Sequence, residues 1–280
     1  MENKTYKWLS FDEKTLFGQS WIPNTKPKAV INFVHGIGEH TDRYSNWMPF
    51  FVEAGYAVFA IEYRGHGRSF GKQGYIKNYN DLLNDIDTLL KQSYNSFPNL
   101  PHFLYGHSLG GGMVIHHALT RKSNINALIA SSPWLLLTQE PPKWQIIAVE
   151  FLRKIIPGLV LKSTIKSDDI TQNKNVIKAY KEDKMIHNKI SIELFLSAYD
   201  NGKWNIKNAH KMPVPFLLTH GSNDNITNIE GSKSFYNNNP EKTNLKIWEG
   251  MFHELHNEPI REEYAQFIIE WLNTNLKGNV

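Results

Sequence analysis

The residues best suited to chemistry lie around Ser108, in the run Gly106-His107-Ser108-Leu109-Gly110. Residues 103–105 before this run have the pattern of a short buried strand, and residues 111–121 after it have the pattern of a helix. A serine between two glycines at a strand-to-helix turn is typical of a nucleophile elbow, which strains the serine backbone and exposes its hydroxyl. Larger residues in place of the glycines would clash with nearby backbone. Ser108 is therefore the predicted nucleophile; the other interpretation is a serine that only caps the helix.

An acid and a base for Ser108 are expected further along the chain, because a serine hydroxyl is a poor nucleophile until a base takes its proton. In this arrangement the order is serine, then an acid, then histidine. Asp224 follows an apolar strand pattern at 216–220, and His253 follows another at 245–248. Loops beyond the ends of parallel strands gather the active site of an open sheet. Asp224 and His253 are therefore the predicted acid and base.

Other titratable residues give alternatives to this pair. His256 shares the loop of His253, but His253 is closer to the end of the strand and is preferred. Glu249 is an alternative acid, at the tip of its strand rather than in the loop. The histidines near the elbow are expected to pack rather than to react: His107, His116 and His117.

The backbone of two loops is predicted to stabilise a negatively charged oxygen. Residues 30–34 form a buried-strand pattern, and His35-Gly36-Ile37-Gly38-Glu39-His40 follows at once. Glycines let such a loop approach a substrate carbonyl closely. The predicted oxyanion donors are the N–H groups of Ile37 and Leu109. His35 is expected to hold the loop through hydrogen bonds rather than to act as a second base.

Several motifs together resemble one known family, and they run in order along nearly the whole chain. They are His35-Gly36-Ile37-Gly38-Glu39-His40, Arg43-Tyr44, Gly65-His66-Gly67-Arg68-Ser69, the elbow, Val214-Pro215-Phe216-Leu217-Leu218 with Gly221-Ser222-Asn223-Asp224, and Trp248-Glu249-Gly250 with His253, His256 and Glu258. This set resembles the α/β-hydrolases of the monoglyceride lipase and lysophospholipase group. The resemblance implies a catalytic triad of Ser108, Asp224 and His253, with Ile37 and Leu109 framing the oxyanion hole. One departure is Glu62, where many members carry aspartate at a position thought to be structural.

The resemblance also implies a function. It implies a serine carboxylic ester hydrolase for monoacylglycerols, lysophospholipids or similar single-chain acyl esters, acting through an acyl-enzyme with no metal or other cofactor. The residues expected to contact the substrate are Gly36, His107, Trp134, Ile147 and Phe151. Two alternatives stay open: a catalytically silent binding protein, and a serine aminopeptidase or amidase, whose candidate anchors for a free amino terminus are Glu140, Glu182 and Asp183.

The order of the elements predicts an α/β fold. Strands are expected near 4–10, 16–22, 29–34, 57–62, 102–105, 127–130, 215–220 and 245–248, and helices near 44–54, 79–94, 109–121, 229–237 and 260–275. Strands and helices alternate from 29 to 130 and again after 214, which argues for a mostly parallel twisted sheet with helices on both faces. With the resemblance, this becomes the α/β-hydrolase fold with an inserted helical cap.

The expected cap is the segment 134–212, which breaks the alternation and is too long for a loop. It contains helical patterns at 144–156 and 190–201 and precedes the strand that leads to Asp224, which is where α/β-hydrolases insert a cap. The predicted division is a core in two parts, 1–133 and 213–280, with the cap between them.

Apolar residues occupy much of the circumference of the expected cap helix 144–156. One face must cover the core. The surplus is expected to line an acyl channel, as the resemblance implies, or to contact a membrane surface transiently beside Lys143, Arg153 and Lys154. The simpler alternative is that a small cap needs a hydrophobic underside.

Composition limits partners and compartment. The 280 residues suit one large α/β domain. With 31 Lys and Arg against 27 Asp and Glu, the net charge of +4 is too small to predict nucleic-acid binding. The absence of cysteine excludes disulfides, thiol catalysis and cysteine metal sites. No signal-peptide or membrane-spanning pattern is found, so a cytoplasmic protein is expected; its oligomeric state is not predicted.

Two cofactor patterns are incomplete. The run His253-Glu254-Leu255-His256 is one residue shorter than a zinc-binding His-Glu-x-x-His helix. The glycine that follows Gly65-His66-Gly67 is Gly71, one position too late for a dinucleotide fingerprint. No cofactor is predicted from the residues.

Overall fold

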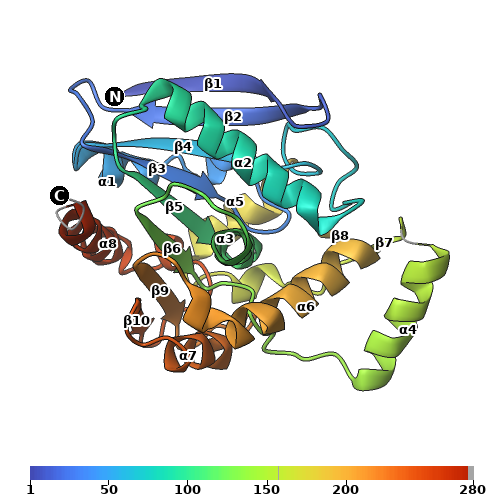
Figure 1. Ribbon diagram of the computed structural model, residues 1–280. Helices are drawn as coiled ribbons and strands as arrows, with labels where there is room; N and C mark the ends of the chain where they lie inside the picture. The colour runs from blue at the N-terminus through green and yellow to red at the C-terminus, as the bar shows by residue number, and fades with distance from the viewer. Residues whose placement is uncertain (157, 277–280) are drawn as a thin grey trace.

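The computed structural model describes residues 1–156 and 158–276 and is built on one eight-stranded sheet. The strand order is β1-β2-β4-β3-β5-β6-β9-β10 (Figure 1). β1 and β2 form an antiparallel hairpin at one edge, β2 pairs antiparallel with β4, and all neighbours from β4 to β10 are parallel. The strands are β1 (Glu2–Leu9), β2 (Thr15–Ile22), β3 (Ala29–Val34), β4 (Tyr56–Glu62), β5 (His102–His107), β6 (Ala127–Ser131), β9 (Phe216–Gly221) and β10 (Thr243–Trp248).

Helices cover both faces of the sheet. Successive side chains of a strand point to opposite faces, so a strand of continuous apolar residues contributes to a core on each side. In β3, Val30 and Val34 belong to one core cluster, whereas Ile31 and Phe33 belong to the other. The first cluster is completed by α2 (Tyr79–Ser96), α3 (Leu109–Thr120) and α7 (Ile229–Asn237), and the second by α1 (Met48–Glu53) and α8 (Arg261–Leu276). Strands covered on both faces read as continuous apolar runs. The structure confirms the predicted fold class.

The predicted helix 44–54 is divided in the structure. Thr41–Tyr44 form a short 3₁₀ turn, and α1 begins only at Met48, with Pro49 in its first turn. Proline is tolerated there because a helix has no partner for the first N–H groups. The other predicted elements of the core are present with ends that differ by a few residues.

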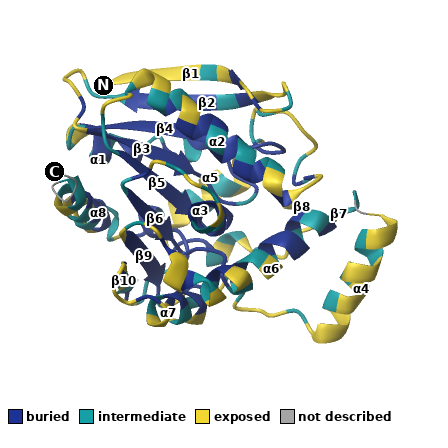
Figure 2. Ribbon diagram, viewed as in Figure 1, coloured by how far each residue is buried: buried dark blue, intermediate teal, exposed yellow. Residues whose placement is uncertain are grey.

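Between β6 and β9 the chain forms α4 (Lys143–Ile155), β7 (Val160–Lys162), α5 (Lys174–Glu182), β8 (Lys189–Ser191) and α6 (Ile192–Lys207). α5 and the antiparallel pair of β7 and β8 were not among the predicted elements. Strands of three residues, such as β7 and β8, are too short to show an alternating pattern. α6 packs on α3 and adds Leu194 and Ala198 to the core, whereas α4 stands away from the sheet and buries none of its residues (Figures 1 and 2). The division at 134 and 212 stays a prediction.

Of the helices that the structure describes, none has the length and apolar content needed to cross a membrane.

Candidate active site

Ser108 lies in the turn between β5 and α3 with a positive φ of 54° and ψ of −118°. A non-glycine residue in this region of backbone costs about 1–3 kcal/mol and persists only when its surroundings hold it. The Ser108 N–H donates to the Ser131 carbonyl at 3.0 Å. A Cβ on Gly106 would lie 2.4 Å from the Gly110 carbonyl oxygen, and a Cβ on Gly110 would lie 2.4 Å from the Val34 carbonyl oxygen. The two glycines therefore make the turn possible.

Asp224 and His253 form a buried acid–base pair. Each follows one of two parallel neighbours, β9 and β10, and His253 Nδ1 lies 2.7 Å from Asp224 Oδ2. The other carboxylate oxygen accepts from the N–H groups of Ile226 at 2.8 Å and Thr227 at 3.0 Å. Burial alone would raise the pKa of the Asp224 carboxyl, but His253 and His220 outweigh it and hold that pKa well below its usual range. Asp224 is therefore ionised near neutral pH.

The His107 ring packs against the His253 ring. It is adjacent to Ser108 in the chain, and its centroid is 4.9 Å from that of His253. Burial holds the pKa of His107 well below its usual range, so the ring is neutral. Among the hydrogen bonds of the described residues, none joins the Ser108 hydroxyl to His253. In resting enzymes such contacts are often long and tighten when substrate binds.

The alternative base and acid lie apart from this pair. His256 is buried, stacks on the Tyr44 ring at 4.7 Å, and has its pKa lowered by burial to about 3. Glu249 is exposed just after β10. The geometry therefore favours Asp224 and His253, the residues preferred from the sequence.

The loop after β3 comes close to the elbow at Gly36, where an added Cβ would lie 3.2 Å from Ser108 Cβ. Ile37 follows and shares a cavity wall with Ser108, while Leu109 is the first residue of α3. Within the described part of the chain, neither the Ile37 N–H nor the Leu109 N–H is taken up by a protein acceptor. Both N–H groups are available near the nucleophile, and their binding of an oxyanion stays a prediction.

His35 holds the loop after β3 through contacts with the loop backbone and with Tyr63. Its Nδ1 lies 2.8 Å from the Gly36 carbonyl oxygen, and its ring stacks on Tyr63 at 4.5 Å. The Tyr63 hydroxyl donates to the same carbonyl at 2.8 Å. Burial lowers the pKa of His35 to about 4, so the imidazole is neutral at pH 7. These contacts fit the structural role expected for His35.

A buried ion-pair network joins the loop after β3 to the loop that carries His253. The Arg43 guanidinium donates two bonds of 2.8 Å to the Glu254 carboxylate and also bonds Glu39. Glu39 in turn accepts the Gly36 N–H at 2.9 Å. Arg43 and Glu39 belong to motifs visible in the sequence, but Glu254, the second carboxylate bound by Arg43, lies 211 residues from it and was not predicted as its partner.

Glu39, His107 and Glu254 bring potential metal ligands within 4.8 Å of one another. Two carboxylates and an imidazole suit several divalent ions. Here the Arg43 guanidinium already bonds both carboxylates, so a divalent ion in the same place would meet a fixed positive charge. The cluster is therefore a structural ion-pair network.

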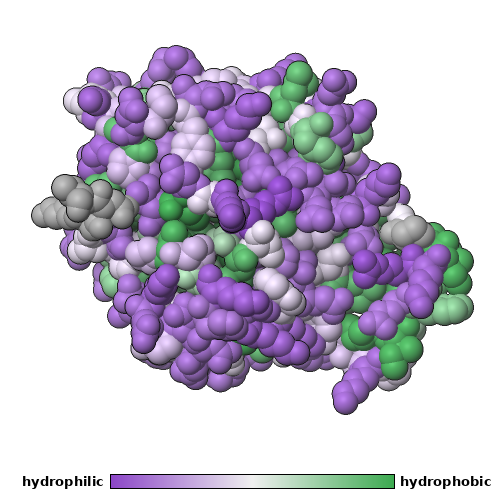
Figure 3. All heavy atoms as spheres, viewed as in Figure 1, coloured by the Kyte–Doolittle hydropathy of each residue, from purple (hydrophilic) through white to green (hydrophobic). Residues whose placement is uncertain are grey.

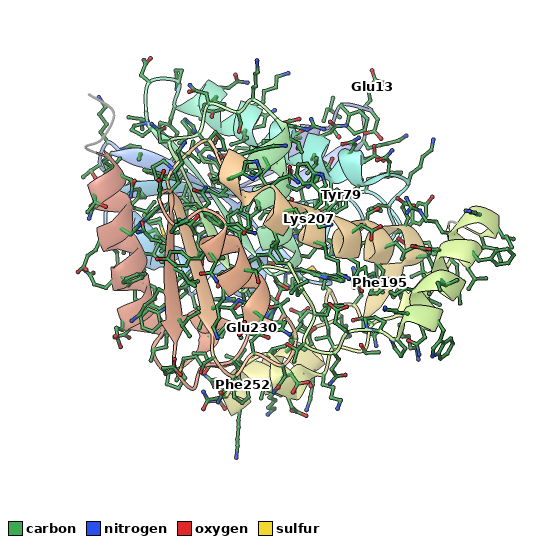
Figure 4. The ribbon with its side chains drawn as sticks, turned by 60° about the horizontal axis from the view of Figure 1, so that its bottom comes forward. Glu13, Tyr79, Phe195, Lys207, Glu230 and Phe252 are labelled. Atoms are coloured by element: carbon green, nitrogen blue, oxygen red, sulfur yellow. The ribbon has the colours of Figure 1, made fainter. Side chains whose placement is uncertain are left out.

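A cavity of about 450 Å³ opens beside Ser108, and its lining includes residues of α4, α6 and the segment between them. Its apolar wall includes Trp134, Ile146 and Val149 from α4, and Phe195 from α6. Figure 4 shows Phe195 on the side of α6 that faces α4. Polar side chains also line it: Gln139, Glu140, Gln145, Lys166 and Asn225.

Comparisons with known proteins agree with this geometry. Residues 25–260 match the family described as serine aminopeptidase, S33. The chain is 31% identical to the monoglyceride lipase of Homo sapiens, over 89% of this chain and 83% of that protein. A crystal structure of monoacylglycerol lipase from Paleococcus ferrophilus has a TM-score of 0.84 and 32% identity, covering 93% of this chain and 99% of that one. The chain belongs to the monoglyceride lipase group of the α/β-hydrolases.

A third relative is longer than this α/β-hydrolase. The chain is 33% identical to an uncharacterized abhydrolase domain-containing protein of Dictyostelium discoideum, with 99% of its own length aligned but only 30% of that protein.

Two of the expected substrate contacts lie elsewhere in this α/β-hydrolase. Ile147 and Phe151 are 66% and 63% exposed on the outer side of α4 and do not line the cavity beside Ser108. Successive helical residues are about 100° apart, so Ile146 and Val149 face inward instead. Trp134 lines the cavity as expected, whereas Gly36 and His107 contact the elbow rather than the cavity wall.

The departure at Glu62 has a structural explanation. Its carboxylate is fully buried and accepts the Thr41 N–H at 3.1 Å, the Thr41 hydroxyl at 3.0 Å and the Arg68 guanidinium. It therefore ties the loop after β4 to the 3₁₀ turn before α1, away from Ser108.

Proposed function

We propose that this α/β-hydrolase, a carboxylic ester hydrolase of the monoglyceride lipase group, cleaves monoacylglycerols and similar single-chain acyl esters with Ser108, Asp224 and His253 as its triad. The observation that carries the proposal is the strained Ser108 at the wall of a cavity of about 450 Å³, with the Asp224–His253 pair buried beside it. Backbone strain at a residue that borders a cavity is typical of a functional site.

The mechanism is acyl transfer to water. His253 takes the Ser108 proton as the hydroxyl oxygen attacks the ester carbonyl, and Asp224 orients the imidazole and stabilises its charged form. The N–H groups of Ile37 and Leu109 hold the oxyanion. His253 then protonates the leaving alcohol, and a water that it deprotonates releases the acid and restores Ser108.

The cavity supports a single acyl chain as the substrate. Trp134, Ile146, Val149 and Phe195 give it an apolar wall that suits a hydrocarbon chain, whereas the charged lining residues lie outside α4 and α6 in the sequence: Glu140, Lys162, Lys166 and Asp169. Polar residues at Gln139, Gln145 and Asn225 give the alcohol part of the substrate hydrogen-bond partners. The cavity volume of about 450 Å³ is in the range of small-molecule sites. Two relatives that bear the name of monoacylglycerol or monoglyceride lipase support the same substrate class.

The direct test combines active-site labelling with a chain-length series. We expect a fluorophosphonate to label Ser108, and p-nitrophenyl esters and monoacylglycerols of medium or long chain to be preferred. Ser108→Ala should lower turnover on the order of a millionfold, a scale taken from serine proteases. Ser96→Ala, at the exposed end of α2, is the matched control and should keep wild-type activity. Full esterase activity in Ser108→Ala would refute the mechanism.

A second candidate, hydrolysis of a peptide or amide, is favoured by the serine aminopeptidase family model and by Glu140 at the cavity wall. The Glu140 carboxylate accepts from the Tyr199 hydroxyl at 2.7 Å, however, and Asp183 pairs with His40. Glu182 is exposed. Labelling of Ser108 without ester turnover, together with release of an amino-terminal residue from peptides, would favour this candidate. No labelling would favour a binding protein.

A cytoplasmic location with transient membrane contact through α4 is part of the same proposal. Trp144, Ile147, Phe151 and Ile155 recur at helical spacing and are between 59% and 67% exposed. Figure 3 shows apolar side chains gathered over α4 at the right-hand edge of the molecule. Lys154 is exposed next to these apolar residues, where its positive charge would attract anionic lipid headgroups.

Vesicle co-sedimentation tests this contact. Anionic vesicles at low salt should retain the wild type and release the double variant Ile147→Ser with Phe151→Ser. Leu9→Ser is the matched control, because Leu9 is 66% exposed on β1 and far from the cap in sequence. Arg153 is held by Glu193 at 2.7 Å, so its replacement should matter less. No binding of the wild type would refute the contact.

A further inference from the structure

His220 is a buried histidine that the proposed mechanism does not use. It lies in β9, and its Nε2 is 3.1 Å from Asp224 Oδ2. His253 Nδ1 approaches the same oxygen to 2.7 Å. The His220 and Asp224 side chains are fully buried, and that of His253 is 5% exposed. Two imidazoles therefore share one buried carboxylate oxygen.

The partners of His220 determine which ring nitrogen carries the proton. Nε2 is hydrogen-bonded to the Thr227 carbonyl oxygen at 3.1 Å and lies at the same distance from Asp224 Oδ2, in an ion-pair contact. Nδ1 lies 2.8 Å from the Ser232 hydroxyl, which is able to donate. A neutral imidazole with its proton on Nε2, accepting from Ser232 at Nδ1, satisfies all of these contacts.

Charge balance leads to the same protonation state. When His253 takes the proton of the nucleophile it becomes an imidazolium, and Asp224 supplies one negative charge to balance it. A second imidazolium at His220 would leave one buried positive charge without a counter-charge, which is costly. When His220 is neutral, the negative charge of Asp224 balances the imidazolium of His253 alone.

The groups that face the Asp224 carboxylate come from several elements. β9 contributes His220, and the loop after β10 contributes His253, with His107 of β5 packed behind it. α7 contributes the Ser232 hydroxyl through His220, and the turn after β9 contributes the Thr227 hydroxyl, which lies 2.9 Å from Asp224 Oδ2 and also contacts the Ser132 carbonyl oxygen. The three histidines are the groups in this set that titrate.

We propose that His220 is a positioning residue for the catalytic acid: its Nε2–H holds the Asp224 carboxylate so that Oδ2 faces His253 Nδ1. The inference rests on the proposed triad and deepens it. Without His220 the carboxylate keeps the backbone N–H groups on Oδ1 and the Thr227 hydroxyl on Oδ2 at 2.9 Å, but it loses the imidazole contact at the oxygen that orients the base. Oδ2 also keeps more of its negative charge, which favours the imidazolium form of His253.

Three substitutions distinguish the effect of losing the N–H donor from the effect of losing the volume of the ring. The amide of His220→Gln reaches the position of Nε2 and can donate to Asp224, that of His220→Asn reaches only the position of Nδ1, and His220→Leu has no donor. We expect kcat for a p-nitrophenyl ester to fall about 10- to 100-fold in the Asn and Leu variants, the scale of a hydrogen bond to a charged group. His220→Gln should keep most of the activity, and KM should change little in all three.

The pH profile distinguishes positioning from packing. The acidic limb of kcat/KM should move to higher pH by about 0.5–1 unit in His220→Leu and His220→Asn, because Asp224 shares less of its charge. It should stay in place in His220→Gln. Equal losses in all three variants with an unmoved acidic limb would mean that His220 only fills space, and the inference would be overturned.

His102 provides a matched control. It is also a buried histidine of a parallel strand, at the opposite end of β5 from Ser108, with its Nε2 3.0 Å from the Phe97 carbonyl oxygen. His102→Leu should lower the melting temperature without moving the acidic limb. A shift equal to that of His220→Leu would show that the limb reports general destabilisation, which would also overturn the inference.

A measurement without substrate separates this inference from the proposed function. With nitrogen-15-labelled histidine, NMR reports the tautomer of His220 and the titration of His253 in the resting protein. We expect a proton on His220 Nε2 and a His253 that titrates at higher pH in His220→Leu than in the wild type. If NMR gives both expected results but the wild type does not hydrolyse esters, the proposed function alone would be refuted. An active enzyme whose His220 carries its proton on Nδ1 would refute the inference alone.

Discussion

Arg43→Gln removes the guanidinium that lies between two buried carboxylates. The side chain of Arg43 is 6% exposed, and those of Glu39 and Glu254 are 5% and 2% exposed. After the substitution Glu39 keeps the Gly36 N–H and the Tyr44 hydroxyl as donors. Glu254 loses both bonds from Arg43.

The expected cost follows from this loss. Removing one partner of a buried ion pair costs about 3–5 kcal/mol, because the remaining charge is left without compensation. The Asn257 side chain still donates to Glu254 at 2.7 Å, which places the estimate near the middle of that range, about 4 kcal/mol. With a urea m-value of about 3 kcal/mol/M, the denaturation midpoint should fall by about 1.3 M at pH 7.5.

The pH dependence of the stability difference between wild type and Arg43→Gln follows from the pKa of Glu254. In the wild type, burial alone would raise the pKa of Glu254, but Arg43 outweighs it and the pKa is lowered. Its stabilising contribution is therefore present above the unfolded pKa of about 4.3 and is lost as pH falls through the folded value. In Arg43→Gln burial acts without the guanidinium and raises the pKa, so the native state takes up a proton before the unfolded chain does. The difference in stability between wild type and variant should therefore shrink from pH 7.5 to pH 5.

Urea denaturation at pH 7.5 and pH 5 is the assay. Arg121→Gln is the matched control, because Arg121 pairs with Asp87 at the surface, where the side chains are 27% and 44% exposed. Such a pair contributes about 0–1 kcal/mol. If Arg43→Gln cost no more than Arg121→Gln, or if its cost were the same at both pH values, the reasoning from burial would be refuted.

Three further predictions follow from the site. Asp224→Asn should lower kcat on the order of ten-thousandfold in a p-nitrophenyl ester assay, and a loss below about tenfold would contradict its role as the acid. Gly38 has φ 73°, and an added Cβ would lie 2.2 Å from the His187 carbonyl oxygen, so Gly38→Ala should cost at least about 2 kcal/mol by thermal melting and lower esterase activity. Burial lowers the pKa of His35 to about 4. Between pH 6.5 and pH 4 the unfolded chain therefore binds a proton at this position that the native state does not bind, and the free energy of unfolding should fall by about 1.4 kcal/mol per pH unit. His35→Asn should flatten this slope in urea denaturation.

The cap shows where local patterns fail to predict structure. The apolar residues of α4 were expected from the sequence, but which of them face the cavity depends on how the helix is rotated against α6. The structure turns Ile146 and Val149 inward and leaves Ile147 and Phe151 exposed. An amphipathic helix with two apolar sides has no pattern in its own sequence that distinguishes them.

The sequence by itself determined the α/β fold and the identity of the elbow. Buried parallel strands need continuous apolar runs, and the turn at Ser108 needs glycines at 106 and 110, so both leave signals within a few residues. The order of Ser108, Asp224 and His253 is likewise visible, because each follows its own strand pattern.

Only the tertiary structure decided which groups surround these residues. The contact of Arg43 with Glu254 spans 211 residues, and that of His253 with Asp224 spans 29. His220 lies only four positions before Asp224, yet its contact needs the turn after β9 to fold back toward the strand. Buried charges and imidazoles obtain their partners from chain segments brought together by folding. No pattern within one segment specifies the partner.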